Sequence, residues 1–583
     1  MIQFKTNLEA NFFDLGTFNR MVLPFWRIFS LIISFLFCSL VGISQNLPAN
    51  FPLLEEYARR AQLNDTSIMR SSFQLRPIQL SNSAGSIDSL FYRTISFENL
   101  NLGVLPILSI SELNSDRPFG WGNFGMIPNK GIQQYLSGGV FGNWKIIEFQ
   151  LQPEFIFAQN LPYYGFPADF NQAIINDRFF YWNNGDYPER FGNSSYTRIW
   201  WGQSKIMAKF GAFEGGISTQ NIWWGPGQWN ALTFSNNAQG FPHLTIRTGK
   251  PAKTFLGNFE TQLLSGRIED SGLSPSQHPA LNEKYFSDFS GDWKYVNALS
   301  ISYNPKWVKG LFLGFNRTFQ VYREKMGDSF LSYFPVFSGI TKEQFFEDGN
   351  SVEFDSDGAD QQISVTFRWV VPASHFEFYG EFGRRDHALN WREFILNPEH
   401  ARAYMMGFMK LFPLNKPSRF LQVRGEMTHQ QESVNRYVRY PGTRGGLTWH
   451  THNPSRAFAN FGQALGVGIG VGSNVQIIEF SMVEEMNKLG LIFQRLENQQ
   501  DFYYRAFGQQ TERKPWIDLS VGLVFDHRWD NLVLGSKILA VNGLNYQWQL
   551  AANGTPEFPK GRNLFSAHAQ VNVIYFLKTK ADK

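Results

Sequence analysis

FSAHAQVNVIYFL, residues 565–577 near the C-terminal end of the chain, is the stretch of sequence that decides the fold. Its side chains alternate between an apolar and a polar class with a period of two. The apolar class is Ala567, Ala569, Val571, Val573 and Tyr575, and the polar class is Ser566, His568, Gln570 and Asn572. The polar face cannot be a packed core, and the apolar face ends in aromatic residues. This is the pattern of a transmembrane barrel strand, with apolar residues toward lipid and polar residues toward the lumen.

The same alternation recurs upstream in paired stretches joined by short turns. They are QQISVTFRWVVPASHFEFYGEFG (361–383), GFMKLFPLNKPSRFLQVRGEM (407–427) and LGVGIGVGSNVQIIEFSM (465–482). Long polar segments lie between other strands, at 268–292, 325–360 and 384–403. Short turns at one end and long loops at the other are typical of outer-membrane barrels, and closure leaves no unpaired backbone edge in the hydrocarbon.

The sequence therefore predicts an all-β fold, a transmembrane antiparallel β-barrel over residues 75–583. At roughly ten residues per strand plus loops, this length allows about 16–18 strands. The strands of a large soluble β-sandwich or propeller would also alternate apolar and polar side chains. However, we see no blade-length repeat, and a soluble sandwich has less reason to place aromatic residues at strand ends.

Composition supports a wall with one apolar and one polar face. Aromatic residues make up 16% of the 583 residues, charged residues only 17%, and the mean hydropathy is −0.27. The net charge of +4 gives no sign of a nucleic-acid partner. The single cysteine excludes a disulfide within the chain.

The N-terminal region predicts export. Basic residues precede an apolar run at 28–43, and the small residues Gly42 and Ser44 suit a signal peptidase, so residues 1–44 are predicted to be a signal peptide, with Met21 as an alternative start. A retained membrane helix would need about 20 apolar residues, and bulky Phe37 disfavours a lipoprotein at Cys38. Apolar residues at helical spacing then predict a short helix within a helical segment at 45–74.

Four stretches could carry chemistry: 115–135, 200–244, 254–269 and 379–411. The second contains NIWWGPGQWNALTFSNNAQGFPHL (221–244), where three tryptophans, a Gly-Pro-Gly and a Ser-Asn-Asn lie close together. Trp223-Trp224-Gly225-Pro226-Gly227, followed by Ser235-Asn236-Asn237-Ala238, resembles the Wzi-type capsule assembly proteins of the outer membrane. The resemblance runs from about Pro106 to about Leu411, and the C-terminal third matches only as generic barrel strands.

The resemblance implies an 18-stranded barrel with small helices near its periplasmic side. It also implies a lectin-like protein that holds capsular polysaccharide at the cell surface of a diderm bacterium. The partners would then be this polysaccharide and outer-membrane lipid. Catalysis is not implied, and no cofactor or metal is expected.

The residues themselves are compatible with sugar binding. Aromatic rings offer stacking area, amides donate to and accept from hydroxyls, and arginine pairs with carboxylates of acidic sugars. The candidates of these types are Arg117, Trp121, Trp223, Trp224, Trp229, Asn236, Asn237 and Arg247. The alternative interpretation makes the tryptophans interface anchors, Gly225, Pro226 and Gly227 a structural turn, and the asparagines partners of buried backbone groups.

The fourth stretch is rich in charge. Its candidates for meeting an anionic glycan are Glu381, Arg385 and Asp386, although a network of ion pairs that fills the barrel is the favoured interpretation. Asp355, Asp357 and Asp360 hint at calcium, but their spacing does not match an EF-hand, so an acidic solvated loop is favoured.

Three functions fit a barrel of this kind. The main prediction is a non-catalytic protein that binds or retains surface polysaccharide during capsule assembly. A porin or glycan-uptake channel is the alternative, and it would need an open lumen. An outer-membrane hydrolase comes third, because the sequence contains neither a Gly-x-Ser-x-Gly elbow nor a zinc-spaced histidine pair.

Overall fold

The structure is a computed structural model. It describes residues 45–47, 51–64, 71–80, 93–97, 100–289, 291–340, 359–386, 391–416, 418–433, 448–453, 455–508, 510, 512–555 and 557–577. The predicted signal peptide at 1–44, with Cys38 and Met21, lies outside the described residues, as do Asp355 and Asp357.

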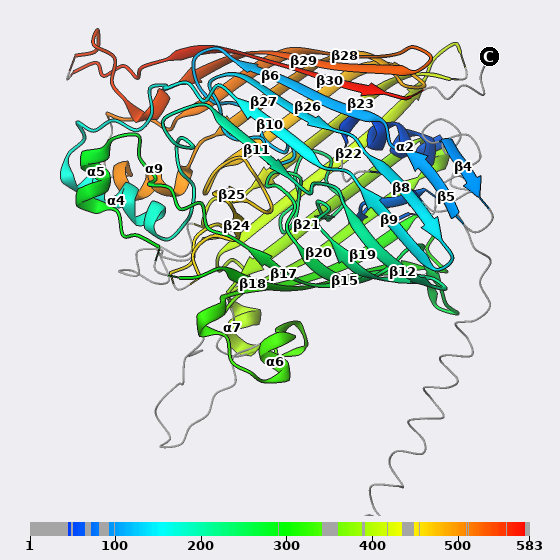
Figure 1. Cartoon of the computed structure of the whole chain (residues 1–583). Coiled ribbons are helices and arrows are strands. Elements are labelled where there is room, and N and C mark those ends of the chain that lie inside the picture. Colours follow the sequence, from blue (N-terminus) through cyan, green and yellow to red (C-terminus); the bar gives the residue numbers. More distant parts are fainter. Residues whose placement is uncertain are drawn as a thin grey trace, which may run out of the picture.

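One antiparallel sheet of 24 strand segments forms the wall of the molecule (Figure 1). The segments are β4 (Arg93–Phe97), β5 (Leu100–Val104), β6 (Ile107–Asn114), β7 (Gly131–Ser137), β8 (Val140–Trp144), β9 (Ile147–Leu151), β10 (Glu154–Ala158), β11 (Tyr196–Trp200), β12 (Lys205–Phe210), β13 (Phe213–Ser218), β15 (His243–Thr248), β16 (Ala252–Lys253), β17 (Gly257–Ile268), β18 (Lys294–Pro305), β19 (Leu311–Tyr322), β20 (Asp360–Val371), β21 (Phe376–Arg385), β22 (Arg402–Pro413), β23 (Arg419–His429), β26 (Asn474–Glu484), β27 (Asn487–Glu497), β28 (Ile517–Arg528), β29 (Leu532–Leu544) and β30 (Leu564–Tyr575).

Consecutive strands pair with each other, and β30 pairs with β6, so the order of pairings returns to its beginning. Five strands are interrupted and appear as two segments each: β5/β6, β7/β8, β9/β10, β11/β12 and β15/β16. The segment β4 pairs only with β5 and lies beside the ring. Counting each interrupted strand once and leaving out β4 reduces the 24 segments to 18 strands in the described residues. The predicted barrel and its strand number are confirmed.

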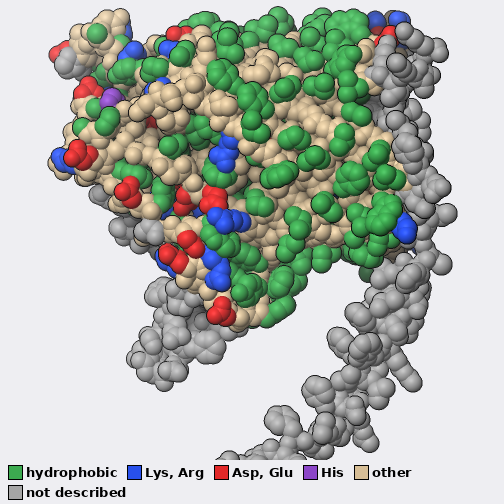
Figure 2. Space-filling view, in the orientation of Figure 1, with side chains coloured by type: hydrophobic (Ala, Val, Ile, Leu, Met, Phe, Trp, Pro, Cys, Tyr) green, Lys and Arg blue, Asp and Glu red, His purple; other side chains and the backbone are tan. Residues whose placement is uncertain are grey.

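The period-two pattern places apolar side chains outside and polar ones inside, as predicted. In β20, Val365 and Trp369 are about half exposed on the outer face, whereas Arg368 between them is fully buried in the lumen. Figure 2 shows hydrophobic side chains spread over the wall, with most charged side chains of this face lying toward the end that carries α4 (Gln172–Asn183) and α5 (Pro279–Tyr285).

The two ends of the barrel differ in the length of their connections. At the end near the C-terminus the strands are joined by short turns, such as the step from Glu484 of β26 to Asn487 of β27. Long connections leave the other end, including residues 159–195, 269–293 and 498–516. This confirms the predicted asymmetry and identifies the short-turn end as periplasmic and the long-loop end as extracellular.

The remaining helices belong to the long connections or to the N-terminal segment, except η3, which forms the short turn between β20 and β21. They are α2 (Pro52–Asn64), α6 (Phe330–Tyr333), α7 (Trp391–Leu396), α9 (Gln500–Phe507), η1 (Arg323–Lys325), η2 (Pro335–Phe337), η3 (Pro372–Ser374) and η4 (Tyr546–Trp548). Among the described residues, no helix has both the length and the apolar character needed to cross a membrane.

Three of the long connections fold into the lumen and bind one another. The backbone of 219–242 accepts a hydrogen bond from Phe124 at Asn236 O (2.7 Å) and donates one from Ser235 N to Leu465 O (2.7 Å). Gln463 donates its side-chain amide to Met126 O at 2.7 Å. Two short strands, β24 (Ala459–Asn460) and β25 (Gln463–Ala464), form a small hairpin in this layer.

The glycine-rich start of the predicted strand at 465–482 lies in this layer, so that part of the prediction was wrong: β26 begins only at Asn474. The physical reason is close backbone approach. A Cβ on Gly466 would lie 2.0 Å from Leu232 O, and one on Gly468 would lie 1.9 Å from the Asn237 side chain.

The N-terminal segment enters the lumen from the short-turn end. Its helix α2 was predicted from apolar spacing, and Phe51, Leu53 and Leu54 pack into a cluster with wall residues. The following β2 (Leu75–Arg76) pairs with β14 (Trp223–Trp224), and β1 (Gln45–Leu47) pairs with β3 (Ile78–Leu80). Thus β2 and β3 pair with other short segments and not with the ring, although they follow the predicted boundary at residue 75.

Candidate functional site

The Trp-Trp pair is part of the packed lumen. Both Trp223 and Trp224 are fully buried. Trp224 donates its indole N–H to Gln262 Oε1 at 3.0 Å and contacts Phe234 edge-on, with ring centroids 4.9 Å apart. The Arg76 guanidinium lies 4.8 Å from the Trp223 ring centroid. The ring faces of this pair are therefore covered by the protein itself.

The Gly-Pro-Gly that follows is a turn whose carbonyls are held by arginines. Arg76 donates to the carbonyl oxygens of Gly225 and Gly227 at 2.9 Å each, and Arg59 of α2 donates to Pro226 O at 2.5 Å. Gly225 has φ of +118°, and a Cβ there would lie 2.6 Å from the Glu381 carboxylate. Glycine is required because both the backbone conformation and the neighbouring carboxylate exclude a side chain.

Most charged candidates connect the wall to the material in the lumen. Glu381 accepts hydrogen bonds from Leu232 N at 3.1 Å and from Ser364 Oγ at 2.7 Å. Arg385 holds Asp360 with its Nη2 2.5 Å from Oδ2 and donates to Trp449 O at 3.0 Å.

The last two charged candidates lie apart from Glu381 and Arg385. Arg247 pairs with Glu214 within the wall at 2.5 Å. Asp386 lies 3.5 Å from His400 Nε2 at the end of β21. The structure therefore does not bring the charged candidates together around one cavity.

The remaining amide and aromatic candidates divide into two groups. Asn236 is fully buried, whereas the half-buried Asn237 donates its amide to Ala464 O at 3.0 Å and accepts from Gly122 N at 3.3 Å. Trp229 is half-buried, and the Arg424 guanidinium lies 4.4 Å from its ring centroid. Of the eleven polysaccharide-binding candidates, Arg117, Trp121 and Asn237 line a common cavity on the loop side of this layer.

We call this cavity the outer chamber. Its volume is about 230 Å³, and it lies among the long connections at the extracellular end. The aromatic side chains that line it, besides Trp121, are Tyr163, Tyr181, Trp182, Tyr187, Phe502, Trp516 and Tyr546. The polar side chains that line it, besides Arg117 and Asn237, are Arg178, Glu189, His450, Gln463, Gln499 and Gln547.

Two helices of the loops position this lining. Asn171 caps α4 by accepting a hydrogen bond from Ile174 N at 3.0 Å, and the helix packs against α9. Tyr181 of α4 contacts Phe502 of α9 with ring centroids 6.5 Å apart, Phe179 contacts Trp182 within α4 at 4.9 Å, and Phe502 contacts Trp548 of η4 at 4.8 Å. This aromatic cluster holds the chamber wall in place and leaves only parts of the rings to face the cavity.

Arg178 is the most unusual polar group of the chamber. Its side chain is 6% exposed, its Nη1 donates to Gln499 Oε1, and its Cζ lies 4.3 Å from the Trp182 ring centroid. Within the part of the chain that the structure describes, no carboxylate lies within ion-pair distance of it, and its Nε has no hydrogen-bond partner. Burial lowers the pKa of Arg178 to about 10, so it remains a cation at neutral pH.

Two further groups complete the electrostatics of the chamber. Burial raises the pKa of Glu189, whose carboxylate accepts hydrogen bonds from Phe166 N and Gln277 N at 2.7 and 3.3 Å. Burial also lowers the pKa of His450 to about 3, so its ring is neutral at physiological pH. Arg117 is already paired with Asp518 at 2.6 Å. The chamber thus offers both donors and acceptors between aromatic rings.

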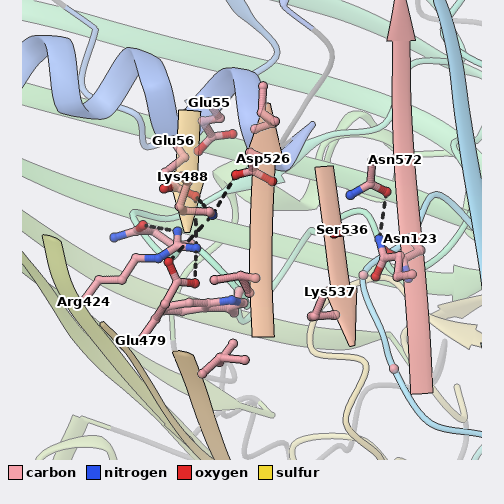
Figure 3. A pocket seen from close by; sticks show the side chains of 18 of the residues that line it. Glu55, Glu56, Asn123, Arg424, Glu479, Lys488, Asp526, Ser536, Lys537 and Asn572 are labelled. Atoms are coloured by element: carbon pink, nitrogen blue, oxygen red, sulfur yellow. Dashed lines mark hydrogen bonds and ion pairs between the residues drawn. The ribbon is translucent and has the colours of Figure 1, made fainter. Parts of the chain in front are cut away.

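A second cavity of about 130 Å³, the inner chamber, lies between this layer and α2. Figure 3 shows its charged lining, in which Lys488 of β27 points between the carboxylates of Glu56, Glu479 and Asp526. Lys488 Nζ lies 2.8 Å from Glu56 and 3.0 Å from Asp526, and Arg424 lies 3.0 Å from Glu56. This ionic network fixes α2 to the wall.

The chambers are separate cavities with a shared boundary. Gly120 and Trp121 line both of them.

Burial raises the pKa of Glu56, but the charges of Arg424, Lys488 and Arg60 outweigh this effect and lower the pKa below its usual range. In the described residues, no group of three or more His, Cys, Asp or Glu side chains is placed to hold a metal ion.

Sequence analysis missed most of the outer chamber. Its main contributors, DRFFYWNNGDYPER (177–190) and QDFYYRAF (500–507), were not among the four stretches singled out. Both combine aromatic residues with side-chain amides, as the Trp-Trp segment does, and both also contain arginine. That signal could have found them.

Comparison with known proteins places this geometry in a family. The family model for the capsule assembly protein Wzi matches residues 177–536. A solved structure of Wzi from Escherichia coli, described as a carbohydrate-binding β-barrel of the outer membrane involved in group 1 capsule assembly, superposes with a TM-score of 0.56 at 12% identity, covering 91% of this chain and 100% of that chain.

Other solved structures and the curated sequences are less similar. OccAB4 of Acinetobacter baumannii has a TM-score of 0.35 at 7% identity, covering 81% of this chain and 97% of its own. A BenF-like porin from Pseudomonas fluorescens has a TM-score of 0.36 at 8% identity, covering 83% and 100%. No curated protein sequence matches the chain. Because the family model covers more than half of the 583 residues, the chain belongs to the Wzi family of capsule assembly proteins.

Proposed function

We propose that this outer-membrane protein binds a surface polysaccharide in the outer chamber and thereby retains capsule on the cell. The observation that carries the proposal is the lining of the chamber: aromatic rings alternate there with amide, guanidinium and carboxylate groups at the extracellular end. Sugars present apolar C–H faces that stack on rings and hydroxyls that pair with both donors and acceptors. The family membership and the carbohydrate binding described for the E. coli relative support the proposal.

One predicted candidate, Trp121, keeps its proposed role, and one residue outside the predicted set, Arg178, joins it. Trp121 is half-buried and faces the chamber, so part of its ring is accessible to a sugar. Arg178, which the sequence did not single out, supplies a buried cation that forms no ion pair with a carboxylate of the described residues. Trp223 and Trp224 are packed inside the lumen, and Glu381 and Arg385 join the wall to the lumen segments, so these candidates have a structural role.

The filled lumen argues against the alternative of a diffusion channel. The helix α2 occupies the lumen at the periplasmic end, and the segments at 219–242 and 448–473 occupy it above. A porin needs a continuous water-filled path, and these segments stand across it.

The chamber supports binding without catalysis. His450 is the histidine that lines it, and among the described contacts its ring nitrogens meet Gln430 and the Tyr187 hydroxyl. Neither partner is the serine, threonine or cysteine that a histidine base activates in a hydrolase of the serine type. We therefore propose that the polysaccharide leaves the site chemically unchanged.

The test compares Trp121→Ala with a matched control, Trp307→Ala. Trp307 is 67% exposed at a short turn of the periplasmic end, far from the chamber. Loss of one stacking face removes roughly 1 kcal/mol, so we expect about fivefold weaker binding of the purified capsular polysaccharide. In cells, capsule should shift from the cell-bound fraction to the medium for Trp121→Ala only.

Heat-modifiability on gels must show that both variants form the native barrel. Native Trp121→Ala and Arg178→Met barrels with undiminished polysaccharide binding and normal cell-bound capsule would remove the outer chamber from the function.

A further inference from the structure

Part of the barrel wall is covered from outside by pieces of the long loops. The helices α6 and α7 and the turn η2 lie against the outer face of the wall at its extracellular end (Figure 1). We call these three elements the outer collar. In the described contacts, η2 packs on β18 and β19, and α7 packs on β21 through Phe394.

Two arginines of the wall beneath the collar lie on its outer face. Arg317 shares its face of β19 with Leu313, which is 42% exposed on the outside, because the two are four residues apart on a strand. Arg384 likewise shares its face of β21 with the exposed Phe382. Yet Arg317 and Arg384 are only 4% and 6% exposed. A guanidinium that faces hydrocarbon is unfavourable, and the more so the deeper it lies in the bilayer.

The collar provides the partners that these guanidinium groups need. Arg317 donates to the carbonyl oxygens of Val336, Ser338 and Gly339 at 3.1, 2.6 and 2.6 Å. Arg384 donates to Phe394 O at 3.2 Å, and its Cζ lies 5.2 Å from the Phe394 ring centroid. The collar thus turns its backbone oxygens toward the wall.

The opposite side of the collar is apolar and uncovered. The exposed fractions are 66% for Phe330, 49% for Leu331, 53% for Phe337, 56% for Trp391, 69% for Ile395 and 57% for Leu396. These side chains continue the apolar outer surface of the strands beneath the collar, where Leu313 of β19 and Phe382 of β21 are 42% and 39% exposed. Arg392, exposed beside Trp391, adds a cation at the rim.

We propose that the outer collar inserts into the extracellular interface of the outer membrane and that lipid is its occupant. The collar is continuous with the lipid-facing wall, it hides polar wall groups that lipid would reject, and it presents aromatic and aliphatic side chains outward. Aromatic residues and short amphipathic helices favour the membrane–water interface. A nearby cation pairs with anionic lipid head groups.

The experiment places a fluorescent label at single cysteines in the full chain, with Cys38→Ser as background. Ile395→Cys and Phe330→Cys report on the collar. Val365→Cys on the lipid-facing wall and Lys284→Cys on α5 in the extracellular loops are the two references. Each protein is reconstituted into vesicles that contain brominated phospholipid, and the label is also titrated with aqueous acrylamide.

We expect brominated lipid to quench both collar labels by a fraction similar to that at residue 365, and to leave the label at residue 284 unquenched. Collar labels that only acrylamide quenches would place the collar in water and overturn the proposal. Collar labels shielded from both quenchers would place it against a protein, either a second copy or a partner, and would overturn it as well. Two label sites keep the test valid if one variant fails to form a heat-modifiable barrel.

Discussion

A single carboxylate of the barrel wall should hold the central segment of the lumen in place. Glu426 on β23 accepts backbone hydrogen bonds from Gln228 N at 2.7 Å, Trp229 N at 3.2 Å and Asn230 N at 2.8 Å. It also accepts from the Tyr379 hydroxyl at 3.0 Å. Glu426→Ala removes every one of these acceptors, so we expect the segment at 219–242 to detach from the wall far more often.

The magnitude follows from the groups that are left without partners. A buried N–H that loses its acceptor costs about 1–3 kcal/mol. Three such groups are affected, and because Gln228 and Trp229 border the inner chamber, water can reach them and the low end of the range applies. The free energy required to open the segment should therefore fall by about 3 kcal/mol, which corresponds to a roughly hundredfold larger open population.

Amide hydrogen exchange measures this opening directly. The informative amides are Leu232 N, bonded to Glu381, and Ser235 N, bonded to Leu465 O at 2.7 Å, because Glu426→Ala leaves their own acceptors intact. If 219–242 opens as one unit, both should exchange roughly a hundredfold faster in Glu426→Ala. The matched control is Glu484→Ala, which removes an ion pair between Glu484 and Arg419 at the periplasmic rim and should leave these amides unchanged.

Unchanged exchange at both reporter amides in a correctly inserted Glu426→Ala barrel would refute the reasoning. It would mean that the bonds to the neighbouring lumen segments hold 219–242 without the wall. Faster exchange in Glu484→Ala as well would point to a general loosening of the barrel and would equally contradict the assignment to Glu426.

Three further outcomes are expected. Mass spectrometry of the membrane-extracted protein should show a mature N-terminus at Gln45, whereas a retained stretch from Phe25 to Ile43 would contradict the predicted signal peptide. Planar-bilayer recordings should show little steady conductance, since α2 and the folded-in segments occupy the lumen, and large porin-like steps would favour the channel alternative. The pKa of Glu56 is lower in the folded protein than the value of about 4.3 in an unfolded chain. The contribution of Glu56 to the docking of α2 is therefore fully present above about pH 4.3 and is lost as the pH falls through the folded pKa. Conductance should rise only in strong acid, and Glu56→Gln should remove this pH dependence.

The wall of the barrel could be predicted from sequence because its pattern is local. Alternation along 361–371 needs no knowledge of distant residues to assign Val365 to the outside and Arg368 to the inside, and the structure confirms both. The same period-two signal misled at 465–473, where alternating glycines serve close packing against Leu232 and Asn237 inside the lumen.

The candidate site was harder to predict because its character depends on distant partners. The Trp-Trp segment has the composition of a sugar platform, but Arg76 and Gln262 cover its rings from other parts of the chain. Conversely, Arg178 becomes notable only when the fold buries it against Trp182, with no carboxylate of the described residues within ion-pair distance. Composition identified the right residue types, and the tertiary contacts decided which of them face a cavity.

The ionic attachment of α2 has a consequence for the order of assembly. The helix is translated long before its partners, since Glu56 pairs with Arg424 and Lys488, and Arg59 pairs with Glu377. These partners stand on β21, β23 and β27, so a complete docking surface exists only after the C-terminal half of the wall has formed. We therefore expect α2, although it is synthesised early, to reach its native position late. A chain arrested before β27 should leave α2 accessible to protease from the periplasm.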